Sequence, residues 1–409
     1  MRTSPVLLTP YGHRMSHSRP RIDTAGRRVR LGRRQLLAPD CRAARTEEVA
    51  DAVVGLHASD PATVHLAACA RLTVPDPADV ERALYTDRSL VRLLCMRRTL
   101  FAVGAQLAPV VASSTGQAIA AKERAGMITW VLDGAPGWDR RRLAEVEAKT
   151  LAALAARGEA TAAELAAEVP DLRETIVVSP GKPYEATVAV SSRILRVLAA
   201  EGHIRRGRPR GGWTSSSFRW TPGTAFADLP APPAPEARAA LTRRRLASYG
   251  PATVEDLKWW TGWTLTDTRR AVAATDAVEV TLDDGTTGLA LPDDLEPVPA
   301  PEPWAALLPG LDPTAMGWKA RDWYLDPDHV PHLFDRSGNI GPTVWWNGRI
   351  IGGWAQRADG EIVWRLLTDD GGSEASAAVA AEAARLASWV GEVRVTPRFR
   401  TPLERKLSS

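Results

Sequence analysis

Residues 191–220 read SSRILRVLAAEGHIRRGRPRGGWTSSSFRW, and this stretch indicates a helix followed by a β-hairpin. Apolar side chains in 191–200 recur at helical spacing, and Gly202 stands where helices commonly end. Residues 203–220 then read as two strands on either side of a glycine-rich turn. Upstream, Thr161–Glu164 is a capping box that opens an earlier helix. Helix, helix, helix and hairpin is the order of a winged helix.

The same order of elements recurs in residues 241–291, which predicts a second module of this kind. Further along, Asn347-Gly348 between apolar runs is a strong hairpin signal, and residues 373–390 form an alanine-rich helix pattern. The expected boundaries are a module at 136–225, a proline- and alanine-rich linker at 226–239, a module at 240–298, and a β-rich domain with one long helix at 299–409.

The N-terminal 30 residues read as a disordered basic arm. Eight arginines fall within residues 14–34 with one acidic residue, Asp23, and few apolar side chains. A solvated tail is the ordinary interpretation of such a run, and translation from Met15 is an alternative. The whole chain, in contrast, is only mildly basic, with 52 Lys and Arg against 48 Asp and Glu. A surface for anions must therefore come from local clustering.

Several functional classes are excluded by what the 409 residues contain. Three cysteines without a CxxC pair favour neither a disulfide framework nor a structural zinc site. His329 and His332 lie in a proline-broken loop without a third ligand, so no metal is expected. No apolar run reaches the ~18 residues that span a bilayer. These features predict a cytoplasmic protein without a metal or an organic cofactor.

The hairpin after residue 203 carries four arginines on a short stretch without any acid, at Arg205, Arg206, Arg208 and Arg210. Guanidinium groups on a thin hairpin suit contacts with phosphates and insertion into a narrow minor groove. A solubilising turn is the alternative interpretation. Because the cluster falls where a wing belongs, we favour nucleic acid. Trp213 at the end of the cluster is a further candidate DNA contact, although packing within the hairpin is the favoured interpretation of this residue.

Residues 55–61, GLHASDP, offer the most specific chemistry. In an extended link His57 and Ser59 point to one side, and a neutral imidazole and a hydroxyl together position a water. Asp60 has two interpretations, either stabilising an oxocarbenium-like sugar or capping the helix that starts at Pro61. A histidine satisfied at a helix end is the alternative for His57.

At these residues the sequence resembles the winged-helix DNA glycosylases of the AlkZ and YcaQ type. The resemblance runs from about residue 31 to 407. Its anchors are the 55–61 motif, RRTLF at 97–101, the helix and wing at 192–213, LLPGLDP at 307–313 with MGWKAR at 316–321, and NGRIIGGW at 347–354.

The resemblance implies an α+β fold of three tandem winged-helix modules and a β-rich domain, forming a C-shaped basic channel around duplex DNA. Residues 31–135 then form the first module. It also implies excision of alkylated purines by a monomer, with double-stranded DNA as partner. The motif in such enzymes is Gln-apolar-Gln or Gln-apolar-Asp, so His57 and Ser59 depart from it at both polar positions.

The implied site residues follow from the same anchors. His57, Ser59 and Asp60 are the catalytic candidates. The DNA-binding candidates are Arg97, Arg98, Arg193, Arg205, Arg206, Arg208, Arg210 and Trp213, with Asp312, Lys319 and Arg321 as accessory residues that either face DNA or brace the C-terminal domain. Two other functions remain open at this point, a non-catalytic DNA-binding protein and a protein-interaction scaffold that uses its Trp-rich C-terminal end.

Overall fold

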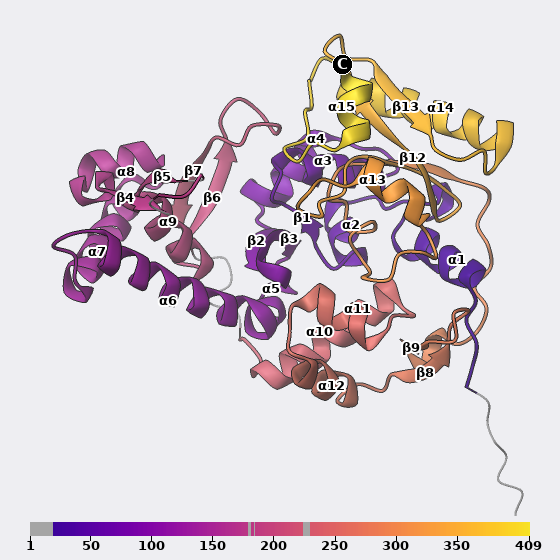
Figure 1. Ribbon diagram of the computed structural model, residues 1–409, viewed down its shortest axis with the longest axis horizontal. Coiled ribbons are helices and arrows are strands. Elements are labelled where there is room, and N and C mark those ends of the chain that lie inside the picture. The colour runs from indigo at the N-terminus through magenta and orange to yellow at the C-terminus, as the bar shows by residue number, and fades with distance from the viewer. Residues whose placement is uncertain (1–18, 179–180, 184, 224–229) are drawn as a thin grey trace, which may run out of the picture.

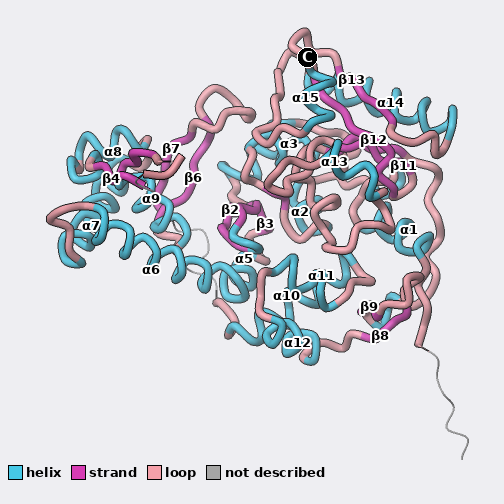
Figure 2. The backbone as a smooth tube through the Cα atoms, viewed as in Figure 1, coloured by secondary structure: helices cyan, strands magenta, loops and turns pink. Residues whose placement is uncertain are grey.

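A computed structural model describes residues 19–178, 181–183, 185–223 and 230–409. The mixed helix and strand architecture that the sequence predicts is confirmed (Figure 2). Figure 1 shows a smaller body, formed by α6 to α9 with β4 to β7, beside a larger body that contains the remaining elements. Among the described residues, no helix is long and apolar enough to cross a membrane.

The chain enters the larger body through a helix, α1 (Thr24–Arg34), where the sequence predicted a disordered arm up to residue 30. That prediction is wrong for residues 24–30, and residues 1–18 lie outside the described part. Asp23 caps the helix at Gly26 N–H. Arg30 is buried on Asp294, with Nε–Oδ1 at 2.9 Å, and Arg27 is buried over the Trp323 ring. These arginines have partners far along the chain, which the local pattern of charge cannot reveal.

The first third of the larger body combines short helices with a small sheet. Its elements are α2 (Thr46–Ala52), β1 (Leu56–His57), α3 (Pro61–Cys69), α4 (Pro77–Glu81), β2 (Leu90–Cys95), β3 (Thr99–Gly104) and α5 (Ala108–Val111). The sheet is antiparallel in the order β1-β3-β2, with His57 opposite Phe101. The 55–61 motif therefore runs from the edge strand β1 into the start of α3.

The smaller body holds the predicted helix and hairpin of residues 191–220. It contains α6 (Gln117–Gly134), α7 (Arg140–Arg157), α8 (Ala162–Glu168), β4 (Thr175–Val178), β5 (Ala186–Ala189), α9 (Val190–Ala200), β6 (Ile204–Pro209) and β7 (Phe218–Pro222). The capping box at Thr161 and the hairpin after α9 are confirmed. The hydrophobic core of this body starts at Met127, inside α6. The predicted module boundary at residue 135 therefore lies too far toward the C-terminus. The continuous helix α6 begins before the core of the smaller body and continues into it.

A second set of three helices and a hairpin follows. It consists of α10 (Ala234–Tyr249), α11 (Val254–Thr261), α12 (Leu265–Ala273), β8 (Val278–Thr281) and β9 (Thr287–Ala290). The start of α10 at Ala234 shortens the linker predicted for 226–239, of which residues 226–229 lie outside the described part. Pro233 and Pro235 sit at the helix start, where proline costs little.

The C-terminal region builds an antiparallel sheet in the order β10-β11-β12-β13. Its elements are β10 (Ala305–Leu308), α13 (Val330–Leu333), β11 (Thr343–Trp346), β12 (Arg349–Gln356), β13 (Ile362–Leu366), α14 (Gly372–Val390) and α15 (Pro402–Ser408). Asn347 and Gly348 both have positive φ, as the hairpin signal requires. One hydrophobic core runs from Leu31 to Leu407, so the first, third and C-terminal regions pack as one body.

Candidate DNA-binding cleft and active site

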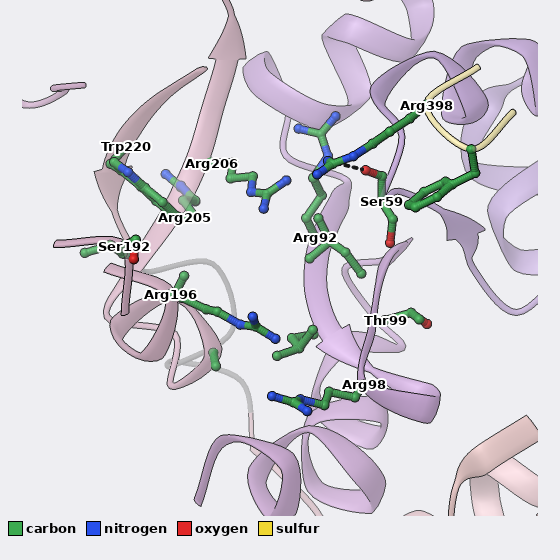
Figure 3. Close-up of a pocket in the computed structure, with 16 residues that line it drawn as sticks. Ser59, Arg92, Arg98, Thr99, Ser192, Arg196, Arg205, Arg206, Trp220 and Arg398 are labelled. Carbon is green, nitrogen blue, oxygen red and sulfur yellow. Dashed lines mark hydrogen bonds between the residues drawn. The ribbon is translucent and has the colours of Figure 1, made fainter. Parts of the chain in front are cut away.

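An arginine-lined cleft of about 430 Å³ lies between the two bodies (Figure 3). The larger body contributes the end of the 55–61 motif, β2, β3 and residues 398–399, and the smaller body contributes α9 and the wing. The arginines that line it are Arg92, Arg98, Arg196, Arg205, Arg206 and Arg398. Of the described residues that line the cleft, none is acidic. Such a surface favours a polyanion such as the phosphate backbone.

Burial lowers the pKa values of two of these arginines, and neighbouring cations add to the effect. Burial, followed by the charges of Arg92, Arg398 and Arg196, lowers the pKa of Arg206 to about 10. Arg205 has its pKa lowered by burial and by Arg88. A group with a pKa near 10 remains protonated at neutral pH, so the wing keeps its positive charge. An anion in the cleft would relieve the repulsion among these groups.

Glu123 on α6 offsets part of this charge. It is paired with Arg98 and, at 3.3 Å, with Arg196 Nε. Both guanidinium-bearing side chains are about half exposed in spite of this shared partner. The one carboxylate therefore holds two cations at the cleft and leaves a net positive surface.

The wing meets the larger body at its tip. Arg208 is paired with Glu81 and lies over the Tyr85 ring, and Arg210 is exposed. Trp213, predicted as a DNA contact, is buried instead. Its ring stacks on His65 with centroids 5.0 Å apart and packs against Trp389 at 5.4 Å. The structure favours the packing interpretation over a DNA contact, and the partners of Trp213 lie on α3 and α14, which local sequence cannot show.

The remaining predicted arginines divide between the cleft and the core. Arg98 lines the cleft, whereas Arg97 lies 3.9 Å over the Trp259 ring and does not line it. Both residues have positive φ, 52° and 61°, in the tight connection between β2 and β3. Arg193 lies over the Trp130 ring in a neighbouring cavity that Arg98 and Arg196 also line. The structure gives Arg97 a packing contact outside this cleft, and its role as a DNA contact stays a prediction.

The two polar residues of the motif, His57 and Ser59, differ in their access to the cleft. Ser59 lines the cleft, and its carbonyl accepts a hydrogen bond of 3.4 Å from Arg398 Nη1. His57 is 3% exposed, does not line the cleft, and packs its ring against Phe101. Its Nδ1 is buried without a hydrogen-bond partner among the described residues. Burial and the nearby charge of Arg97 lower the pKa of His57 to about 3, so the imidazole is neutral.

Asp60 caps α3, as one of its two interpretations proposed. Its Oδ1 accepts from Ala62 N–H at 3.1 Å and its Oδ2 accepts from Arg398 N–H at 2.9 Å. Both oxygens are thus engaged by backbone donors, and the side chain is buried. This geometry favours the capping interpretation of Asp60.

The accessory candidates brace the larger body. Asp312 is fully buried in a bidentate ion pair with Arg71. Lys319 contacts Glu255 at the surface, and Arg321 lies over the rings of Trp259 and Phe334. None of the three lines the arginine-rich cleft, so their bracing alternative is the one the structure favours.

Some residues of the cleft were not predicted from the sequence, among them Arg92, Arg196, Arg398 and Phe399. Arg196 could have been found, since it follows Arg193 by about one helical turn on α9. Arg398 and Phe399 gave no local signal, because they reach the motif from the other end of the chain.

The structure offers no support for a metal at the histidine pair. His329 precedes the short helix α13 and His332 lies within it. The described part of the chain contains no group of three or more potential metal ligands. The site is therefore described by the cleft residues alone.

The two buried histidines predict acid sensitivity of the fold. The pKa of His65, like that of His57, is held at about 3 by burial. The unfolded chain takes up protons below about pH 6.5, whereas the folded protein does not until about pH 3, so stability falls as pH drops through this window. We expect each histidine to cost about 1 kcal/mol between pH 6.5 and 5.5.

Urea unfolding at these two pH values measures the loss of stability. His65→Gln, which cannot titrate, should remove about half of it. Equal stability at pH 6.5 and 5.5, or an unchanged loss in His65→Gln, would contradict the burial of neutral imidazoles.

Comparison with known proteins agrees with this architecture. The sequence profile of the family described as DNA glycosylase AlkZ-like matches residues 50–389. Among solved structures, the DNA glycosylase AlkZ of Streptomyces sahachiroi superposes with a TM-score of 0.69 at 23% sequence identity, covering 92% of this chain and 99% of that chain. No curated protein matches the chain in sequence. The profile spans most of the chain and includes the motif and the wing, and the chain therefore belongs to the AlkZ-like DNA glycosylase family.

Proposed function

We propose that the chain is a monofunctional DNA glycosylase that releases cationic or bulky alkylated purines, of the N7-alkylguanine type, from duplex DNA. The observation that carries the proposal is the cleft, where six arginines surround one end of the 55–61 motif. Phosphate contacts from the arginines would position the duplex, and the motif would then lie beside the reacting nucleotide.

The three sets of helices with a sheet or hairpin would act as winged-helix modules, and the cleft would be part of a basic channel for a monomer. The repeated order of elements in α7 to β7 and in α10 to β9 supports this assignment. The sheet β1-β3-β2 with α2 to α4 would be the first module. The wing of the second module would lie along the DNA, since Arg205 and Arg206 contribute their charge to the cleft.

The reaction needs little help from the protein. An N7-alkylguanine carries a positive charge, so breaking the bond between C1′ and N9 releases a neutral base with the bonding electrons. A water then forms a bond to C1′ and loses a proton, leaving an abasic site. Ser59 at the cleft surface and the neutral His57 two residues before it would orient that water. Orientation without strong proton abstraction suits a leaving group that is already activated.

The wing arginines should dominate the electrostatic part of DNA binding. Arg205→Ala with Arg206→Ala is expected to weaken duplex binding and to reduce the slope of log affinity against log salt by about 0.9 for each phosphate that the variant leaves unneutralised. Fluorescence anisotropy with an undamaged duplex between about 50 and 200 mM salt measures this slope. Arg141→Ala is the matched control, since its side chain is 79% exposed on α7 and lies outside the cleft. Equal slopes in the two variants would exclude the cleft as the binding surface.

A non-catalytic DNA-binding protein is the second candidate. The burial of His57 and the small Ser59 at the two polar positions of the motif favour it. The two candidates separate on duplexes that carry a single N7-methylguanine, a bulkier N7 adduct or an interstrand crosslink. A glycosylase leaves an alkali-labile abasic site in at least one of them, whereas a binding protein leaves all three duplexes intact and binds them like undamaged DNA.

A further inference from the structure

The C-terminal segment 395–400 returns to the start of α3 and completes the cleft. Arg398 makes two contacts with the motif, its N–H donating to Asp60 Oδ2 at 2.9 Å and its Nη1 donating to the Ser59 carbonyl at 3.4 Å. The dashed line in Figure 3 marks the second of these. Arg398 and its neighbour Phe399 both line the cleft. Asp60 therefore fastens a distant segment beside Ser59, in addition to capping its own helix.

Phe399 differs from the other aromatic group at the cleft. Trp220, which also lines it, is a core residue of the smaller body and packs edge-on against Phe218. Phe399 is only half-buried and lies outside the hydrophobic cores. It is the aromatic face that the larger body presents among the described residues of the cleft. Base stacking on such faces is a common means of holding an exposed nucleobase.

The charge of the surroundings indicates which base this face suits. Six guanidinium groups repel a positively charged purine, whereas the face of an aromatic ring attracts a cation. The Arg398 guanidinium lies over the Phe399 ring, 5.8 Å from its centroid. A cationic base would therefore stack on the opposite face of the ring, which is the favourable surface for it within an otherwise repulsive cleft. A neutral guanine gains only ordinary stacking there.

We propose that Phe399 is a specificity-determining residue that stacks on the alkylated, cationic nucleobase, and that Asp60 is the positioning residue that holds it beside Ser59. The proposal rests on the proposed glycosylase function for its substrate, but its first test is a binding ratio that does not require turnover. Asp60 acts through the Arg398 N–H bond and not by touching the sugar.

The test compares dissociation constants for a duplex with one N7-methylguanine and for the same duplex undamaged. Phe399→Leu is expected to lower the preference for the lesion by about 2- to 30-fold, the range for loss of one cation–π contact. Affinity for undamaged DNA should fall by less than affinity for the lesion, because a neutral base loses only ordinary stacking. Phe399→Trp should retain the preference. Phe334→Leu is the matched control, since Phe334 also packs beside an arginine but lies outside the cleft.

Asp60→Asn separates the two roles of Asp60. Asparagine caps helices as well as aspartate does, but one of its two terminal groups is an NH₂ that cannot accept from Arg398 N–H. The variant should keep its folding stability and lose lesion preference, and Asp60→Asn with Phe399→Leu should lose no more than Phe399→Leu alone.

The outcomes distinguish this inference from the proposed function. If the wild type releases the base and Phe399→Leu has the same lesion preference as the wild type, the inference about Phe399 is overturned and the proposed glycosylase function is retained. Lesion preference that depends on Phe399, without base release, would support the inference and contradict the catalytic proposal. A wild type without lesion preference would overturn the stacking role.

Discussion

Asp312→Ala is expected to lower the free energy of unfolding by about 3–5 kcal/mol, because it leaves a fully buried guanidinium without its counter-charge. Arg71 and Asp312 are both 0% exposed and joined by two bonds of 2.7 and 2.9 Å. Arg71 also donates to the carbonyls of Gln35 and Ala67 and to the Thr314 hydroxyl. The pair thus ties α3, residue 35 and the segment after β10 into one core.

Urea unfolding followed by circular dichroism measures this loss of stability. Arg71→Met with Asp312→Leu should recover most of it, since an apolar pair of similar volume leaves no charge unpaired. Lys319→Ala is the control for an exposed ion pair and should change stability by less than about 1 kcal/mol. A loss below about 1 kcal/mol in Asp312→Ala would mean that water reaches the pair, contrary to its burial.

His57→Ala is expected to slow base release by about 10²-fold, the lower end of the range for a general acid or base, because the imidazole would orient the water without taking its proton. The imidazole is neutral, its Nδ1 has no hydrogen-bond partner among the residues that the structure describes, and it lies two residues from Ser59. It would therefore act through a hydrogen bond and not through charge. His57→Gln should therefore keep most of the rate, because the amide supplies both a donor and an acceptor. For the same reason the rate of base release should show no inflection from His57 between about pH 5 and 8.

Single-turnover release under saturating enzyme separates this effect from binding. Affinity for undamaged duplex should be equal in wild type and His57→Ala, because His57 does not line the cleft. His65→Gln is the matched control, since His65 has a similar burial and pKa but stacks on Trp213. An unchanged rate in His57→Ala would remove this residue from the mechanism and leave Ser59 alone at the cleft surface.

Local signals predicted much of the fold correctly. The Thr161 capping box, the helix and hairpin around Gly202 and the turn at Asn347-Gly348 depend on neighbours within a few residues, and each is present. The cap formed by Asp60 on α3 belongs to the same class. Short-range hydrogen bonds of this kind are encoded where they are made, so the local sequence suffices to find them.

Contacts between distant segments account for the failures. From the sequence, the arginines of α1 are predicted to be solvated. In the folded protein Arg30 of this helix pairs with Asp294, which lies far along the chain. In the sequence, Trp213 reads as part of the arginine-rich hairpin. In the structure its ring is covered by His65 of α3 and Trp389 of α14. Arg398 contacts Asp60 although the two lie 338 positions apart in the sequence. The sequence therefore predicts a basic cleft but does not identify Arg398 and Phe399 as part of it. These positions depend on tertiary packing, which neither spacing nor composition reports.

The central claim is that the chain cleaves an N-glycosidic bond, and base release from a duplex with a single N7-methylguanine tests it most directly. The wild-type protein, in excess over the duplex, is incubated without metal, and abasic sites are then cleaved with alkali. We predict one alkali-dependent cut at the lesion, faster than spontaneous depurination and absent from the undamaged duplex. Tight binding of the lesion duplex with no release above the spontaneous rate would contradict the account.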